Sequence, residues 1–363
     1  MSEKKSCIQL LCFLAAGLVL TALFVFCVDP FYHYHNAWFG IPVVLENAVY
    51  QTPGAARNFD YDSVIVGTSM TENFRASWFA EELGWNTVKL SYSGARTDDM
   101  RAILDEVFSR KEPPAHIVMD INAYQLTEPS WSRYADRPQY LYDRNPITDI
   151  SYLYNHDVAL AGLNRILDRL ENRQSDLDAA YTWEDPSYFG RLQAQESARQ
   201  IREDLTADGA AGKHDRVITP LSSWLEVCDQ NLDNITPFIE MYPETEFVIF
   251  YPPYSMLYWE QEVLKGELEE MMQVYRHSLS RLLSYENVTI YYFQDEEEII
   301  TNLDNYRDVS HYGPQFNRYI FECIRDGKNV LTEDNMEEHL DKMYKFAEGF
   351  DYYSLWQEEE TNP

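Results

Sequence analysis

Short apolar runs alternate with amphipathic stretches along most of this chain. The runs have the length and the Val and Ile content of buried strands. They lie at 62–66, 86–90, 116–121, 246–253 and 287–293. Helical spacing of apolar residues marks 74–83, 97–110, 256–284 and 314–326. Strands that alternate with helices in this way predict an α/β fold, in which helices cover both faces of a parallel sheet.

The alternation is interrupted once, in residues 129–235. Helical patterns appear there near 149–172, 186–205 and 220–241, with no strong strand pattern between them. We expect a helical insertion that lies over one end of the sheet, within a domain that spans residues 59–330. Residues 331–363 are expected to form an acidic, aromatic and partly helical tail.

The N-terminus contains a long apolar segment. Residues 7–28 carry no charged side chain and are long enough to cross a bilayer as one helix. Lys4 and Lys5 precede the segment, which predicts residues 1–6 in the cytoplasm and the remaining chain outside. A cleaved signal peptide is the alternative, but the end of the segment lacks a small-residue cleavage pattern. Residues 29–58 are expected to form an aromatic juxtamembrane segment.

The composition argues against one class of partner. The chain has 60 acidic and 29 basic residues, which give a formal net charge of −31. A field of this sign repels phosphate backbones, so we expect no binding to nucleic acid.

Cysteine and histidine usage gives no sign of a metal centre. Three cysteines fall in the apolar segment, which leaves Cys228 and Cys323 for the rest of the chain. Two cysteines make no disulfide framework, and no CxxC or His-rich spacing suggests zinc. We therefore expect buried thiols, no metal and no cofactor.

Residues with chemical potential follow several of the predicted strands. The first strand ends in Gly67, Thr68 and Ser69, the second is followed by Gly94, and the third by Asn122. A loop before the last predicted helix contains Asp308 and His311. Because ligand sites of open parallel sheets lie beyond the carboxyl ends of the strands, we expect these residues to share one site.

This set of residues matches the requirements of acyl-transfer chemistry. A serine nucleophile needs a histidine to take its proton and a carboxylate to orient that histidine. Ser69, His311 and Asp308 are the candidates for these catalytic roles. The oxyanion that develops needs hydrogen-bond donors, which the amides of Ser69 and Gly94 and the side chain of Asn122 could supply.

Each of these residues also has a purely structural interpretation. Ser69 could cap a helix, because Glu72 three residues later completes a capping box. Asp308 could close a turn, Asn122 could form an Asx turn, and Gly94 could serve a positive φ. The pairing of the serine with the aspartate-x-x-histidine spacing favours the catalytic interpretation.

Two further residues are candidates for substrate binding. Arg96 follows Gly94 and could bind an anionic substrate or pair with a neighbouring carboxylate. Tyr254, in the sequence YPPYS at 251–255, could line the cleft or pack in the core.

At these motifs the chain resembles the SGNH/GDSL hydrolase superfamily. More specifically, it resembles the membrane-anchored branch found in bacterial cell-envelope acylation systems, which includes the alginate acetylation proteins and the SGNH-like protein of teichoic-acid D-alanylation. The segment VIVGTSMTENF matches the first block with Ser69, SYSGA matches the second with Gly94, and DVSHY matches the last with Asp308 and His311. The third block, usually glycine-x-asparagine-aspartate, reads DINA here, so only Asn122 is retained.

The resemblance implies a flavodoxin-like three-layer α/β/α sandwich, no metal, and ester hydrolysis or O-acyl transfer. It also implies an envelope polysaccharide or polymer as substrate and a multi-span membrane-bound O-acyltransferase as a partner that supplies the acyl group. The alternative is a non-hydrolytic accessory partner of such an acyltransferase.

Overall fold

The computed structural model describes residues 2–130, 137–210 and 220–357. Met1, parts of the predicted insertion at 129–235 and the last residues of the predicted tail at 331–363 lie outside the described residues.

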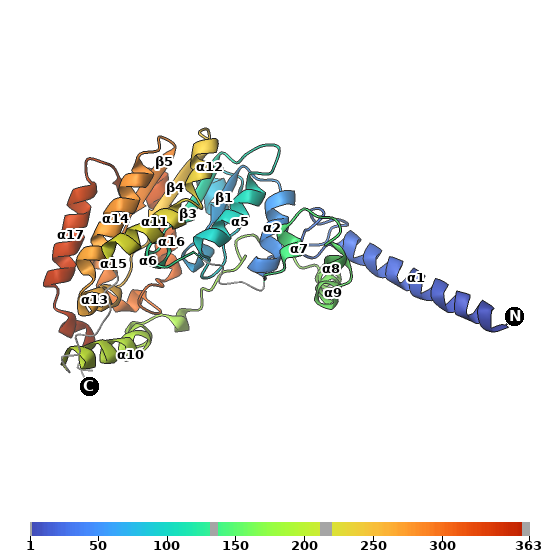
Figure 1. Ribbon diagram of the computed structural model, residues 1–363, viewed down its shortest axis with the longest axis horizontal. Coiled ribbons are helices and arrows are strands. Elements are labelled where there is room, and N and C mark those ends of the chain that lie inside the picture. The colour runs from blue at the N-terminus through green and yellow to red at the C-terminus, as the bar shows by residue number, and fades with distance from the viewer. Residues whose placement is uncertain (1, 131–136, 211–219, 358–363) are drawn as a thin grey trace.

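A six-stranded sheet forms the centre of the molecule, in the order β2-β1-β3-β4-β5-β6 (Figure 1). The first five strands are parallel, and β6 pairs antiparallel with β5 at one edge. The strands are β1 (Ser63–Val66), β2 (Thr87–Lys89), β3 (His116–Asp120), β4 (Glu246–Tyr251), β5 (Val288–Tyr292) and β6 (Val330–Leu331). The predicted α/β class with a mostly parallel sheet is confirmed. The short antiparallel strand β6 was not predicted.

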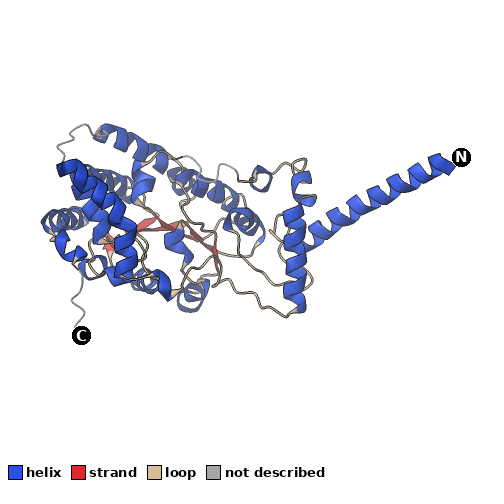
Figure 2. Cartoon of the chain, turned by 90° about the horizontal axis from the view of Figure 1, so that it is seen from below, coloured by secondary structure: helices blue, strands red, loops and turns tan. Residues whose placement is uncertain are grey.

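The strand sequences explain why the sheet lies in the core. Every residue of β1 and β2 is buried, and in β3 and β4 only the first residue is partly exposed. Near-continuous Val, Ile and Phe side chains are typical of parallel strands covered on both faces. Figure 2 shows helices on both sides of the sheet, an arrangement compatible with a three-layer sandwich.

Neighbouring helices α2, α5, α11 and α14 contact one another in succession, while α4 and α16 contact each other. Because crossovers between parallel strands are right-handed, α4, which connects β1 to β2, and α5, which connects β2 to β3, belong on opposite faces of the sheet. Helices up to β3 and directly after it are α1 (Ser2–Val28), α2 (Ala48–Asn58), α3 (Ser69–Glu72), α4 (Ala76–Leu83), α5 (Thr97–Val107) and α6 (Ala123–Thr127). The helices that follow before β4 are α7 (Gln139–Tyr142), α8 (Ile150–Leu153), α9 (His156–Leu170), the 3₁₀ helix η1 (Pro186–Tyr188), α10 (Arg191–Ala210), α11 (Leu221–Leu232) and α12 (Thr236–Met241). The remaining helices are α13 (Met256–Lys265), α14 (Leu268–Leu283), α15 (Glu297–Ile300), η2 (Leu303–Asn305), α16 (Pro314–Asp326), α17 (Met336–Gly349) and η3 (Tyr352–Trp356).

The N-terminal helix α1 extends away from the rest of the molecule (Figure 1). Its residues Lys4–Val28 form one helix that is long and apolar enough to cross a membrane. Most side chains of this helix are exposed, which distinguishes it from a helix buried in the core.

The structure differs from the sequence predictions at several boundaries. The juxtamembrane segment predicted at 29–58 contains α2, which packs against α5 and buries Ala55 and Ala56 completely, so the domain begins before residue 59. The single helix predicted at 256–284 is two helices, because Gly266 has a left-handed φ of 73° and ends α13.

The C-terminal tail predicted at 331–363 is integral to the fold as far as the structure describes it. Helix α17 packs against α13 and α14, and its Leu340, Met343 and Ala347 are buried. The prediction failed because α17 is amphipathic, with its acidic residues Glu337, Glu338, Asp341 and Glu348 all exposed, so that its composition conceals the buried face.

The segment 129–235 also departs from the expected insertion over one end of the sheet. Its helices lie in three places: α9 packs against α1, α10 against α13, and α11 against α14. Helix α11 is therefore part of a helix layer that covers the sheet, while α9 lies next to the N-terminal helix.

Candidate active site

Ser69 is the first residue of α3, directly after the carboxyl end of β1. Thr68 caps this helix, since its side chain accepts a hydrogen bond from the amide of Met70 at 3.2 Å. The interpretation of Ser69 itself as the cap is therefore wrong. Because the preceding threonine fills that role, the Ser69 hydroxyl is available for another partner.

Gly67 allows the buried side chain of Asp120 to contact Thr68, the residue before the serine. The carboxylate of Asp120 accepts hydrogen bonds from the amide of Thr68 at 2.9 Å and from its hydroxyl at 2.6 Å. A Cβ atom on Gly67 would lie 2.0 Å from Oδ1 of Asp120 and 2.7 Å from a methyl carbon of Thr71. The glycine before the serine is thus required by close approach.

We expect Gly67→Ala to lower the free energy of unfolding by about 3 kcal/mol or more, because the added methyl group overpacks the Asp120 contact. Denaturant unfolding monitored by circular dichroism measures the effect. Gly349→Ala is the matched control, since a Cβ there meets nothing within 4 Å. The control should be neutral or stabilise by up to about 1 kcal/mol, because Ala is the better helix former. Equal stability of the two variants would contradict the role of Gly67.

A short loop between η2 and α16 brings Asp308 and His311 to the serine. An antiparallel bridge between Tyr306 and Tyr312 closes the loop at its two ends. The hydroxyl of Tyr312 donates to the carbonyl oxygen of Met70 at 3.2 Å, which ties the loop to α3. Asn317 from α16 donates to the same carbonyl at 2.6 Å. The loop and the serine are therefore held in one fixed arrangement.

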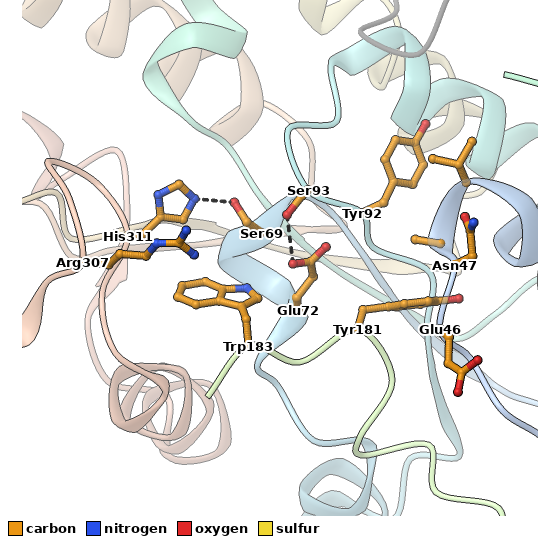
Figure 3. A pocket seen from close by; sticks show the side chains of 12 residues that line it. Glu46, Asn47, Ser69, Glu72, Tyr92, Ser93, Tyr181, Trp183, Arg307 and His311 are labelled. Atoms are coloured by element: carbon orange, nitrogen blue, oxygen red, sulfur yellow. Dashed lines mark hydrogen bonds between the residues drawn. The ribbon is translucent and has the colours of Figure 1, made fainter. Parts of the chain in front are cut away.

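The three side chains form a continuous chain of hydrogen bonds. The Oγ atom of Ser69 lies 2.7 Å from Nε2 of His311 (Figure 3). On the other side of the ring, Nδ1 of His311 lies 2.7 Å from Oδ2 and 2.9 Å from Oδ1 of Asp308. This order of serine, imidazole and carboxylate is the geometry that nucleophilic serine catalysis requires.

Asp308 is held in its ionised form. Burial alone would raise the pKa of this carboxyl, but hydrogen bonds from His311 and Ser310 outweigh it and lower the pKa to about 2. The backbone amides of Ser310 and His311 donate to Oδ1 at 3.0 and 2.8 Å. A charged carboxylate in this position fixes the ring orientation and favours a proton on Nδ1 of His311, so that Nε2 can accept one from Ser69.

Two backbone amides are available to an oxyanion near the serine. Ser69 is the first residue of its helix, so its amide has no acceptor within that helix. Gly94 lies in the turn after β2 with a φ of 67°, a conformation that favours glycine, and it lines the same cavity as Ser69.

The side chain of Asn122 reaches this region but is already engaged. Its Nδ2 donates to the carboxylate of Asp120 and, at 3.3 Å, to Oγ1 of Thr68. Its Oδ1 accepts from the hydroxyl of Tyr254 at 2.6 Å. Asn122 would have to exchange one of these bonds to contact an oxyanion, and in the structure it buttresses the turn that carries Ser69.

The two predicted substrate contacts lie on the wall of the cavity with partners of their own. The guanidinium of Arg96 donates to Glu128 at 2.6 Å and lies over the ring of Tyr124. Tyr254 is buried, and its hydroxyl bonds Asn122 and the amide of Ala123. In this structure Arg96 therefore pairs with a neighbouring carboxylate and Tyr254 packs in the core, as their structural interpretations predicted.

Ser69 and His311 line two cavities, with volumes of about 500 and 660 Å³. Ser93 and Arg307 line both of them. The smaller cavity is also lined by Glu72, Tyr181 and Trp183, as Figure 3 shows. The sequence predictions missed these five residues.

Trp183 lies in the segment between α9 and α10, and a hydrogen bond of its backbone holds it beside the site. Its amide donates to the buried side chain of Asn73 at 2.9 Å, and its ring lies edge-on to His311 with centroids 5.5 Å apart. No local pattern marks this tryptophan in the sequence, since only tertiary structure brings it beside His311.

Arg307 precedes Asp308 on the same loop and its side chain is exposed. The guanidinium lies over the rings of Tyr188 and Trp183, at 5.2 and 5.9 Å from their centroids. Among the residues that the structure describes, no carboxylate lies within ion-pair distance of it. In a chain with a net charge of −31, a guanidinium without a neighbouring carboxylate among the described residues is unusual.

Glu72 is buried beneath the smaller cavity, and its carboxylate accepts a hydrogen bond from Ser93 at 3.1 Å. Burial raises the pKa of this carboxyl, against hydrogen bonding from Ser93 and the nearby His311.

The described residues hold no cluster of three or more His, Cys, Asp or Glu side chains that could bind a metal ion. Cys228 and Cys323 are free and buried.

Fold and site together define an α/β protein with a serine, histidine and aspartate chain at the carboxyl edge of a mostly parallel sheet. In comparisons with known proteins, no family model matches the chain and no curated protein matches it.

Proposed function

We propose that this chain is a membrane-anchored, extracytoplasmic serine esterase or O-acyltransferase of the SGNH type. One observation carries the proposal, the 2.7 Å contact from Ser69 Oγ to His311 Nε2, with Asp308 bound to the opposite ring nitrogen. Two supporting features are the strand order 2-1-3-4-5 of the parallel strands and the position of Ser69 beside the junction of β1 and β3, where doubly wound sheets bind ligands.

The mechanism is a double displacement. His311 takes the proton from Ser69 as the serine oxygen attacks the carbonyl carbon of an ester donor. The tetrahedral oxyanion is held by the amides of Ser69 and Gly94. Collapse of this intermediate expels the donor alcohol, which takes the proton from His311, and leaves an acyl group on Ser69. A hydroxyl of the acceptor, or water, then gives its proton to His311 as its oxygen attacks the acyl carbon. The bond from that carbon to Ser69 Oγ breaks, and the serine oxygen takes the proton back from His311.

Transfer and hydrolysis share these steps and differ in how far water is excluded. Helix α1 and the two cavities beside the serine favour an acceptor from the cell envelope, such as a polysaccharide or another hydroxylated polymer. A membrane-bound O-acyltransferase would be a suitable partner to supply the acyl group. Lys4 and Lys5, in the first turns of α1 before its uncharged part, favour a cytoplasmic N-terminus.

A fluorophosphonate probe tests the proposal directly, because it reacts only with an activated serine. We expect stoichiometric labelling of Ser69, located by mass spectrometry of the digested full-length chain. His311→Ala should abolish labelling, because the serine then lacks a base. Ser284→Ala, which alters an exposed serine at the end of α14, should label like the wild type. Labelling absent from the folded wild-type chain would favour the alternative of a non-hydrolytic accessory protein.

Arg307 gives an expectation about substrate charge. An exposed guanidinium beside the nucleophile favours an ester whose acyl or alcohol part carries a carboxylate or phosphate. We expect Arg307→Gln to raise the KM of an anionic ester about 10- to 100-fold, the equivalent of losing one charged hydrogen bond. The KM of a neutral ester of the same size should change little. Equal effects on both esters in steady-state assays would show that Arg307 acts on the shape of the site only.

A further inference from the structure

Helix α9 carries a row of exposed leucines on one face. Leu160, Leu163, Leu167 and Leu170 are between 49% and 71% exposed. Their spacing of three, four and three residues places them on one side of the helix. A contiguous apolar strip of this kind is unusual on a surface that faces water.

The other face of α9 packs against the end of the N-terminal helix. Val158, Gly162 and Arg165 are the buried residues of α9. At Gly162 a Cβ atom would lie 3.2 Å from the ring of Phe24 and 3.6 Å from Val28. Helix α9 thus lies at the level of residues 24–28, where α1 ends. Figures 1 and 2 show that α9 runs across the end of α1 and not along it.

Residues 34–39 surround the same end of α1 and also expose apolar side chains. His35 contacts the carbonyl oxygen of Phe26 at 2.7 Å and stacks on the ring of Trp38. Trp38 and Phe39 are 41% and 72% exposed. Arg169 of α9 donates to the carbonyl oxygen of Phe39 at 3.2 Å, which joins this loop to the leucine helix.

We propose that α9 and the loop 34–39 form a collar that lies in the outer lipid interface, with its leucines and aromatic side chains among the acyl chains and headgroups. The occupant of this surface is the bilayer. The collar is continuous with the exposed apolar surface of α1, and it lies where that helix would leave the membrane. An amphipathic helix in the plane of the interface, with aromatic and arginine residues at headgroup level, is a stable arrangement.

The collar also sets the position of the candidate active site. Arg165 of α9 binds the carboxylate of Glu46 at 2.8 Å, and Arg173, just beyond the end of α9, binds it at 3.2 Å. Glu46 in turn lines the cavity that contains Ser69 and His311. A collar fixed in the interface would therefore hold this cavity at a constant height close to the bilayer surface. The inference rests on the proposed membrane anchor but not on the proposed chemistry.

Lipid quenching of a fluorescent residue tests the collar in the full-length chain. An environment-sensitive fluorescent amino acid is introduced by nonsense suppression at position 163, one chain per nanodisc of phosphatidylcholine and phosphatidylglycerol. Emission is compared between ordinary and brominated acyl chains. Phe13, exposed in α1, and Leu192, 74% exposed on α10 at the opposite end of the molecule, provide the inserted and the water-exposed reference positions (Figure 1).

We expect loss of emission in brominated lipid at positions 13 and 163 and none at 192. Quenching at 13 without quenching at 163 would overturn the collar while leaving the anchor intact. No quenching at either position would remove the anchor and the collar together. A spectral shift at 163 that appears only with two chains per disc would assign the leucines to contact between copies and would also overturn the proposal. Circular dichroism of each labelled chain checks that the fold is retained.

Discussion

Ser69→Ala should reduce ester turnover at least about 10³-fold, with little change in stability. The effect is large because in the proposed mechanism the serine oxygen is the attacking atom, and neither His311 nor Asp308 can replace it. The stability should be nearly unchanged, because Thr68 caps α3 and the Ser69 hydroxyl has a hydrogen bond only to His311 among the side-chain contacts described.

The measurement is steady-state hydrolysis of an acetyl ester by the purified full-length chain, with the free energy of unfolding measured in parallel. Ser284→Ala provides the matched serine control and should retain wild-type kcat. If Ser69→Ala retained full turnover while remaining folded, the proposed nucleophile would be wrong. Residual activity at the level of the uncatalysed reaction would support it.

Asp308→Asn should lower kcat by about 10³- to 10⁴-fold, because the amide no longer stabilises the imidazolium that forms during attack. Binding of the ester should be affected much less, since Asp308 is separated from the substrate by His311. The change should therefore appear in kcat and not in KM. An unchanged kcat in a folded variant would exclude Asp308 as the orienting carboxylate.

The same substitution has a pH signature in stability. The folded pKa of Asp308, about 2, lies below the ordinary value of 3.8. The ionised carboxylate therefore contributes up to about 2 kcal/mol that is fully present above about pH 4 and is lost as the pH falls toward 2. Unfolding free energies of wild type and Asp308→Asn should differ most above pH 4 and converge below it. A difference that grows on acidification would contradict the sign.

The sequence was informative about the candidate triad because of two local patterns. An apolar strand followed by a glycine and a serine, and an aspartate three residues before a histidine, can both be read without tertiary information. Parallel strands end at one edge of a sheet, which explains why Ser69 comes close to a loop more than 200 residues later.

The surroundings of the triad could not be predicted in the same way. The orientation of the Asn122 side chain depends on the position of the Asp120 carboxylate, which it binds. That carboxylate can lie against Thr68 only because Gly67 has no Cβ atom. Trp183 and Arg307 reach the site from two distant segments. Neither residue belongs to a periodic pattern that would reveal its position.

The predicted helix boundaries were wrong where the apolar spacing of a helix continued through a turn. The apolar spacing across 256–284 does not show that Gly266 adopts a left-handed φ, because glycine is also tolerated within helices. The acidic composition of 331–363 concealed the buried face of α17, which has only a few apolar residues. In both cases packing against other helices decided the structure.

The candidate triad and part of the wall of its cavity come from different segments of the chain. The proposed nucleophile Ser69 and its two partners are held by the sheet edge and by the loop that Tyr306 and Tyr312 close. Part of the cavity wall, including Tyr181 and Trp183, comes from the long connection between β3 and β4. Under the proposed function, substitutions in that connection would alter the choice of acceptor and leave the reacting groups in place.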